Sequence, residues 1–298
     1  MVELDFGFLS LRHVDRTGLT SQKFFLERLA PIFFPLRVAR LVELPELDSR
    51  VCSMVLPLGS GNLQHLDREK RRRMLEHHDV LMNDFQLRVL AVDRRLKDDF
   101  LSLDCKHPLI FGDYFIEVLA LVQIRRLVSN YRVKKIIIVG ASAHFSMFLE
   151  ALNEFNLPVS IQSYRPDRYE VLAYRLLYEK GCAVSTSRLN PTEWEKGDLV
   201  VALASGSDFR GYPSFCLHLG DDQYGLAPEL DKRLEQSGWE GCLHHLAPLL
   251  ESTMLTKAGY FESNEEPIKV SDNMLDLPYL EGLGSQMGLW DRFLDKAL

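Results

Sequence analysis

The feature that most constrains the fold is an alternation of short apolar segments with longer helical ones after residue 130. IIIVG (136–140), PVSIQSY (158–164), CAVS (182–185), DLVVALASG (198–206) and SFCLHLG (214–220) have the composition of strands, and helical segments lie at 145–155 and 168–181. Strands that alternate with helices at these lengths predict parallel βαβ units. IIIV and LVVALA are almost continuously apolar, as strands covered on both faces are. We therefore expect a doubly wound parallel sheet with residues 136–140 at its centre.

The segments on either side have a different pattern. Residues 1–60 look irregular apart from candidate strands at 36–43 and 51–58; further on we expect a helix from Asp67, a strand at 87–93 and an apolar helix at 114–128. From residue 227 the chain is mostly helical, and we expect Pro248 to interrupt the last helical stretch. The predicted fold class is α/β. A doubly wound sheet (131–225) follows a smaller α+β domain (1–130) and precedes C-terminal helices (226–298) that pack on the other domains.

Charge and cysteine content exclude several classes of protein. The net charge of -7 argues against general nucleic-acid binding, which usually needs a basic surface. Five scattered cysteines suggest no disulfide framework. The first residues, MVELDFGF, are acidic where a signal peptide is basic, and no apolar run approaches the roughly 20 residues that span a bilayer. These features predict a cytoplasmic protein without a transmembrane segment.

The strand at 136–140 runs into a turn of small residues, Gly-Ala-Ser-Ala-His-Phe-Ser (140–146). A strand–glycine turn–helix binds pyrophosphate because small residues let the backbone approach and the helix N-terminus presents free N–H groups. At three-residue spacing the small residues are Gly140, Ala143 and Ser146, so only the first is glycine. The turn predicts a nucleotide site that also includes Ser142 and His144.

The next strand ends in Tyr-Arg-Pro-Asp-Arg, with Arg165 and Arg168 at its end. An acidic residue at this place accepts the ribose hydroxyls of NAD, whereas an arginine suits the 2′-phosphate of NADP. The two arginines therefore favour NADP as the cofactor and a small-molecule nucleotide as the partner.

A hydrolase nucleophile elbow, G-x-S-x-G, is an alternative interpretation of residues 140–144. Asp221 or Asp222, followed by His244 or His245, would complete a triad in the required chain order. Against this interpretation, histidine replaces the last glycine of the elbow and no oxyanion segment precedes it.

A metal site is the other alternative. Cys216-x-His218 and Cys242-x-His244 repeat the tripeptide C-L-H, and in a strand the first pair would share one face. No third ligand is apparent, so the sequence predicts no metal.

Five stretches in a fixed order carry a resemblance to a known family. They are MVLPLGSGN (54–62), FGDYFIEVLALVQIRRLV (111–128), VKKIIIVGASAHFS through SYRPDRYEVL (133–172), DLVVALASG (198–206) and HLAPLLESTMLTKAGYFE (245–262). Together they resemble the long-chain acyl-acyl-carrier-protein reductases of cyanobacteria. These bacterial enzymes are relatives of the shikimate dehydrogenase and glutamyl-tRNA reductase type of Rossmann domain.

The resemblance implies an NADP-binding Rossmann domain in which Ser205, on the fourth strand, faces the cofactor. Two departures affect the activity. Only Gly140 of the family's turn glycines is present, and the glycine-rich segment that carries the family's thioester-forming cysteine has no counterpart, since Cys216 and Cys242 lie in other contexts. We therefore expect an NADP-dependent oxidoreductase that acts on a substrate other than a long-chain acyl thioester, with unknown catalytic residues. The alternative is a non-enzymatic binding or regulatory protein on a decayed reductase fold. Either protein could form a homo-oligomer.

Overall fold

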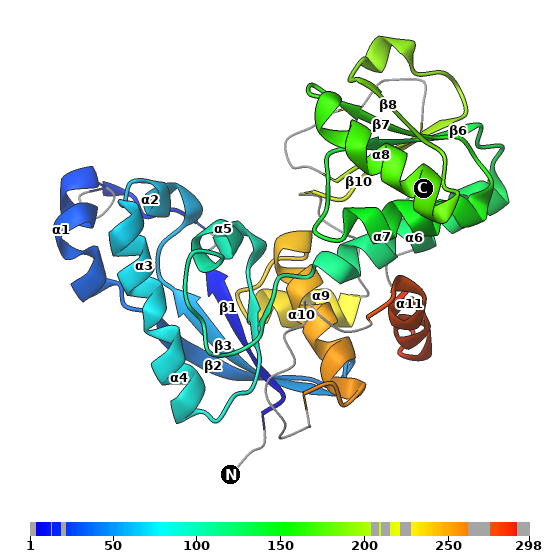
Figure 1. The fold of residues 1–298 in the computed structure, drawn as a ribbon. Coiled ribbons are helices and arrows are strands. Elements are labelled where there is room, and N and C mark those ends of the chain that lie inside the picture. Colours follow the sequence, from blue (N-terminus) through cyan, green and yellow to red (C-terminus); the bar gives the residue numbers. More distant parts are fainter. Residues whose placement is uncertain are drawn as a thin grey trace. The chain divides into compact units, whose positions relative to one another are not determined.

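The computed structural model describes residues 4–12, 14–18, 22–203, 209, 215–220, 228–261 and 275–290. Contacts divide the chain into two compact units (Figure 1): unit 1 comprises residues 1–112 and 225–274, and unit 2 comprises residues 113–224 and 275–298. The division into domains at residues 130 and 225 stays a prediction, whereas the contacts place the first division between Gly112 and Asp113.

Unit 1 is built on a five-stranded sheet of order β2-β3-β1-β4-β5. Strand β1 pairs in parallel with β3 and β4, β4 pairs in parallel with β5, and only β2 is antiparallel to its neighbour β3. Its helices and strands are β1 (Phe6–Leu11), α1 (Lys23–Phe33), β2 (Arg37–Leu44), β3 (Ser49–Leu56), α2 (Ser60–Gln64), α3 (Arg68–Glu76), α4 (His78–Asp84), β4 (Leu90–Val92), α5 (Lys97–Phe100), β5 (Leu109–Ile110), α9 (Pro228–Gln236) and α10 (Leu243–Lys257).

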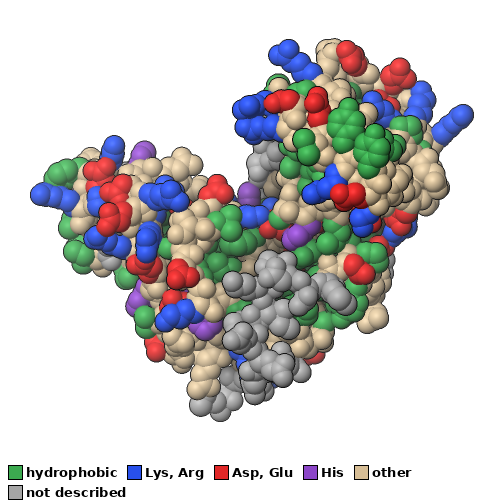
Figure 2. Space-filling model, viewed as in Figure 1, with side chains coloured by type: hydrophobic (Ala, Val, Ile, Leu, Met, Phe, Trp, Pro, Cys, Tyr) green, Lys and Arg blue, Asp and Glu red, His purple; other side chains and the backbone are tan. Residues whose placement is uncertain are grey.

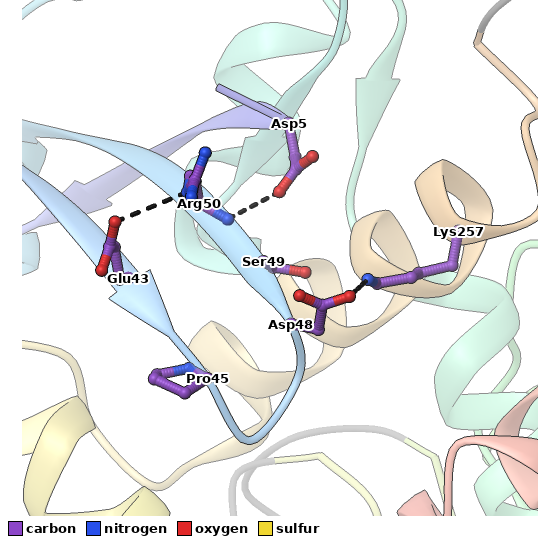
Figure 3. A pocket seen from close by; sticks show the side chains of 7 residues that line it. All are labelled: Asp5, Glu43, Pro45, Asp48, Ser49, Arg50 and Lys257. Atoms are coloured by element: carbon purple, nitrogen blue, oxygen red, sulfur yellow. Dashed lines mark hydrogen bonds and ion pairs between the residues drawn. The ribbon is translucent and has the colours of Figure 1, made fainter. Parts of the chain in front are cut away.

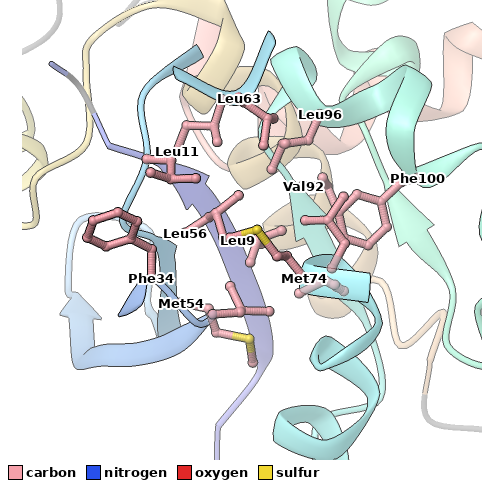
Figure 4. Close-up of a cluster of buried hydrophobic side chains, with 14 of the residues drawn as sticks. Leu9, Leu11, Phe34, Met54, Leu56, Leu63, Met74, Val92, Leu96 and Phe100 are labelled. Atoms are coloured by element: carbon pink, nitrogen blue, oxygen red, sulfur yellow. The ribbon is translucent and has the colours of Figure 1, made fainter. Parts of the chain in front are cut away.

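The expectation that residues 1–60 are irregular outside two strands is wrong, because β1 is the central strand of this sheet. Every residue of β1 is buried, so the strand shows none of the apolar–polar alternation that marks a half-exposed strand. Leu9 and Leu11 enter the main hydrophobic cluster of unit 1, where they pack with Met54, Leu56 and Val92 (Figure 4).

The expected interruption at Pro248 is also wrong, because α10 runs through this proline. A proline inside a helix removes one backbone hydrogen bond, at a cost of about 3 kcal/mol. Tertiary packing offsets this cost: α10 is buried along nearly its whole length and contacts β1, β4 and β5. Gly112 lies directly against the peptide bond between Ala247 and Pro248, since a Cβ on it would be 2.3 Å from the carbonyl carbon of Ala247.

Unit 2 contains a five-stranded sheet of order β10-β9-β6-β7-β8, and every pairing in it is parallel. Its elements are α6 (Asp113–Asn130), β6 (Lys135–Val139), α7 (Phe145–Ala151), β7 (Val159–Ser163), α8 (Asp167–Lys180), β8 (Val184–Arg188), β9 (Asp198–Ala202), β10 (Phe215–His218) and α11 (Leu277–Gln286). The chain runs from central β6 outward to β8, then returns to β9 on the other side of β6. This is the doubly wound arrangement of a Rossmann-like fold.

The predicted parallel sheet with a central strand at 136–140 is therefore confirmed. All five residues of β9 and four of the five in β6 are buried, which explains why these strands read as continuous apolar runs. Helix α6 is similarly buried on most of its faces and packs against α11. No helix in the described part of the chain is long and apolar enough to span a membrane.

Candidate functional site

The candidate site begins at the turn that follows the central strand β6. Gly140 has a φ of +94°, in the left-handed region that favours glycine. Strand β6 is followed by β7 on one side and β9 is followed by β10 on the other, so the turn after β6 lies at the topological switch point. Ligands of doubly wound sheets bind in the crevice at that point, outside the carboxyl ends of the strands. The backbone thus meets the first requirement of a nucleotide site.

The residues that follow Gly140 in this turn are partly accessible to solvent. Ala143 is exposed, and Ser142, His144 and Ser146 are half-buried. Helix α7 then begins at Phe145, with His144 as its N-cap residue. That these residues bind a nucleotide stays a prediction.

A buried carboxylate from α6 occupies the end of this turn. Glu117 has no exposed surface, and its Oε1 accepts a hydrogen bond of 2.9 Å from the backbone N–H of His144. Its Oε2 lies 3.5 Å from Nδ1 of the same histidine. The N–H groups at this position are the ones that a pyrophosphate would use, so an anion supplied by the chain itself already takes one of them.

Helix α6 also fixes the ring of His144. Tyr114, one turn before Glu117, stacks on His144 with ring centroids 3.6 Å apart and planes 12° from parallel. Among the described residues, three buried atoms at this turn lack a hydrogen-bond partner: Ser142 Oγ, His144 Nδ1 and Glu117 Oε2. Such a group of unsatisfied polar atoms marks a place where a ligand or water would be expected.

Sequence reasoning missed Glu117 and Tyr114. The available signal was an acidic residue in the middle of YFIEVLALV, an otherwise apolar helix. Buried carboxylates are rare unless they are paired, so Glu117 pointed to a buried partner, although the sequence could not identify His144.

The predicted arginines lie at the carboxyl end of β7, next to β6. Val139 pairs with Gln162, so Gly140 and the loop after Ser163 are at the same edge of the sheet. Arg165 and Arg168 are exposed, and within the described part of the chain neither side chain takes part in an ion pair. Both guanidinium groups are therefore available to an anion. Ser205, the remaining predicted contact, lies outside the described residues.

Unit 1 contains a second glycine turn that is also filled by a carboxylate of the chain. A Cβ on Gly59 would lie 2.1 Å from Oδ1 of Asp15, and one on Gly61 would lie 2.3 Å from its Oδ2. The backbone N–H of Asn62 donates to the same Oδ1 at 3.1 Å. The GSGN turn thus holds Asp15, and its glycines are needed for the close approach of that side chain.

The nucleophile-elbow interpretation receives no support. Ser142 is not among the described non-glycine residues with positive φ, whereas an elbow holds its serine in a strained turn. His245 cannot act as the base, because Glu240 N–H donates to its Nδ1 and its Nε2 contacts Asp93. Asp221 and Asp222 lie outside the described residues.

The metal-site interpretation also receives no support from the described residues. No group of three or more potential metal ligands occurs among the described residues. Cys242 is the N-cap residue of α10 and is 3% exposed. Burial raises the pKa of its thiol to about 11, so at neutral pH it is not the thiolate that a thioester-forming nucleophile requires.

An open polar depression of about 420 Å³ lies in unit 1 (Figure 3). It is lined by Asp5, Glu43, Pro45, Asp48, Ser49, Arg50 and Lys257. Two ion pairs lie in it, Arg50 with Glu43 and Lys257 with Asp48, and the backbone N–H of Arg50 donates to Asp5. It also lies at the amino ends of β1 and β3, the opposite end from where ligands of parallel sheets bind. We assign it no function.

No protein-family model and no curated protein matches the sequence. Among solved structures, the crystal structure of L-tryptophan dehydrogenase from Nostoc punctiforme is similar over 97% of this chain and 80% of that one, with 11% identical residues and a TM-score of 0.39. A superposition of this quality says nothing about activity or site residues. The doubly wound fold of unit 2 is established by its own strand order and pairing.

Proposed function

We propose that unit 2 binds an NADP-type dinucleotide at the carboxyl ends of β6, β7 and β9. The observation that carries this proposal is the placement of Gly140, at φ +94°, directly after the central strand of a doubly wound sheet, at the same sheet edge as two arginines that form no ion pair with the described residues. The chemical role that we propose is oxidation or reduction of a small-molecule substrate.

The two ends of such a ligand fit this turn unequally. On the adenosine side, Arg165 and Arg168 suit a ribose 2′-phosphate, because guanidinium groups bind phosphate through two parallel hydrogen bonds. On the pyrophosphate side the residues do not fit, because the Glu117 carboxylate already accepts the His144 N–H and repels a second anion. We therefore propose weak binding dominated by the adenosine 2′-phosphate.

Replacing Arg165 with alanine is expected to weaken NADPH binding about tenfold or more, since hydrogen bonds between charged groups contribute roughly 1.5–3 kcal/mol. NADH binding should change by less than about twofold, because NADH lacks the phosphate that the guanidinium contacts. Calorimetric titration of both nucleotides measures the difference. Arg132→Ala is the matched control, since Arg132 is exposed and precedes β6 at its amino end. Equal losses for NADPH and NADH would contradict the assigned role.

A second function is favoured by the two carboxylates that fill the glycine turns. With Glu117 bound to the His144 N–H and Asp15 packed against Gly59 and Gly61, both glycine turns hold a carboxylate of the chain itself. This supports a binding or regulatory protein that uses the Rossmann-like scaffold without a dinucleotide. If neither NADPH nor NADH binds to the wild type or to a Glu117→Gln variant, this second function replaces the first.

Reduction of long-chain acyl thioesters is not part of either function. The high pKa and burial of Cys242 support this view, as does the absence from the sequence of the segment that carries the family's nucleophile.

A further inference from the structure

Helix α8 of unit 2 exposes an unusual number of large apolar side chains. The exposed fractions are 78% for Val171, 62% for Tyr174, 46% for Leu177 and 82% for Tyr178. Only Leu176 of this helix is buried. Figure 2 shows hydrophobic side chains gathered over α8, with charged side chains at their edges. We name these four exposed residues the α8 patch.

The members of the α8 patch lie on one side of the helix. Val171, Tyr174 and Tyr178 have the spacing i, i+3, i+7, which places them along one stripe, and Leu177 lies beside it. A helix in a doubly wound sheet ordinarily turns its apolar stripe toward the sheet and presents polar residues outward. Here the outward side is apolar, and this calls for a partner.

The size of the patch suits an interface between proteins. Its exposed side chains amount to on the order of 450 Å², within the size of the largest apolar patches of monomers, which are often functional. Two such patches facing each other would bury roughly 1,000 Å² with the flanking residues, near the lower limit of a specific interface. Tyrosine is enriched at such interfaces because it combines a large apolar ring with a polar hydroxyl.

The charges beside the patch suit a second copy of the same helix in the opposite direction. Arg168 and Glu179 are 11 residues apart, about three helical turns, so they lie on the same side of the stripe near opposite ends. Among the described residues neither side chain takes part in an ion pair. In an antiparallel pair, Arg168 comes opposite Glu179 of the partner subunit, and twofold symmetry forms this pair twice.

We propose that the α8 patch is the interface of a twofold homodimer, in which α8 packs antiparallel against α8 of a second copy of this chain. This proposal shares only Arg168 with the nucleotide site, and variants of Tyr174 and Tyr178 test the dimer without changing a residue of that site.

Sedimentation velocity of the full chain over a wide concentration range tests the dimer. The wild type should show a concentration-dependent shift from monomer to dimer. Tyr174→Glu, which places a charge near the twofold axis in each subunit, should raise the dissociation constant about 100-fold. Tyr279→Glu is the matched control, because Tyr279 is also a half-exposed tyrosine on a helix of unit 2 but lies on α11. It should leave the dimer intact.

Charge reversal tests the antiparallel arrangement. Arg168→Glu and Glu179→Arg should each weaken the dimer, because each places like charges opposite one another. The double variant should restore the association to near the wild-type constant. A wild type that stays monomeric up to its solubility limit, or a dimer that survives both Tyr174→Glu and Tyr178→Glu, would overturn the proposal. A double variant that associates no more tightly than the single variants would overturn the antiparallel pairing. Unchanged circular dichroism and melting temperature would show that the variants are folded.

Discussion

Replacing Asp93 with alanine is expected to lower the free energy of unfolding by about 3–5 kcal/mol. Asp93 follows β4 in unit 1 and has no exposed surface. Its carboxylate accepts hydrogen bonds from Arg95 Nη2 at 2.7 Å and from the Leu11 N–H at 3.3 Å, and its Oδ2 lies 3.0 Å from His245 Nε2. Removal of the carboxylate leaves the half-buried guanidinium of Arg95 and the buried imidazole of His245 without their shared partner.

The tautomer of His245 explains why the contact is specific. The backbone N–H of Glu240 donates to Nδ1 at 2.7 Å, so in the neutral ring the proton is on Nε2 and is donated to Asp93. This contact joins α10 to the carboxyl end of β4, from a residue about 150 positions away in the chain. Its loss should therefore destabilise the whole of unit 1.

The same carboxylate predicts how stability depends on pH. Burial alone would raise the pKa of Asp93, but the hydrogen bonds from His245 and Arg95, together with the positive charge of Arg95, outweigh burial and hold its pKa well below the usual range. The folded pKa is thus lower than the unfolded value near 3.9. The resulting stabilisation is complete above about pH 5 and is lost as the pH falls below 4.

Urea denaturation at pH 7 and at pH 3 measures both effects. At pH 7 the difference between wild type and Asp93→Ala should be about 3–5 kcal/mol, and it should shrink at pH 3. Asp98→Ala is the control, since Asp98 is an exposed residue of α5, and it should change stability by less than about 0.5 kcal/mol. A loss at Asp93 no larger than at Asp98 would show that the buried contact does not stabilise the fold.

Gly112→Ala is expected to lower the free energy of unfolding by a similar amount, about 3 kcal/mol or more. Gly112 has a φ of +77°, which alone costs a side chain about 1 kcal/mol. The new Cβ would also lie 2.3 Å from the Ala247 carbonyl carbon and 2.4 Å from the Pro248 nitrogen. Both are backbone atoms of a buried helix, so the clash can be relieved only by moving α10.

Gly181→Ala separates these two causes. Gly181 caps α8 at a φ of +66°, close to that of Gly112, but a Cβ there meets nothing within 4 Å. Gly181→Ala should therefore lower the free energy of unfolding by only roughly 1 kcal/mol, the cost of backbone strain. Thermal unfolding of the two variants under one buffer condition gives the comparison. Equal losses would contradict the close approach of Gly112 to α10.

The sequence was most informative where local pattern and tertiary environment agree. Strands β6 and β9 were found because both of their faces are buried, which makes each an unbroken apolar run. The end of α8 was found because Gly181 adopts a left-handed conformation there. In unit 2 the order of strands and helices then fixed the parallel sheet, since parallel neighbours need crossover connections.

The sequence was least informative where long-range contacts override local preference. Strand β1 was missed although it is central, because its neighbours β3 and β4 come later in the chain and its FGFLSL pattern does not alternate. Pro248 locally predicts a break, but burial of α10 outweighs it. At the candidate site, the turn and its arginines were readable from local sequence, whereas the contact between Glu117 and His144 spans 27 residues and could not be deduced from either segment.

The central claim, that the Gly140 turn is a nucleotide site weakened by its own carboxylate, is tested most directly by titrating NADPH into wild type and Glu117→Gln. Glutamine keeps the size of the side chain and the oxygen that accepts the His144 N–H, but it removes the negative charge. Two like charges about 4 Å apart repel by on the order of 4 kcal/mol at an effective dielectric constant of ~20, and solvent near the turn reduces this value. We predict that Glu117→Gln binds NADPH at least about tenfold more tightly than the wild type. Equal or weaker NADPH binding by the variant, at unchanged melting temperature, would contradict the claim.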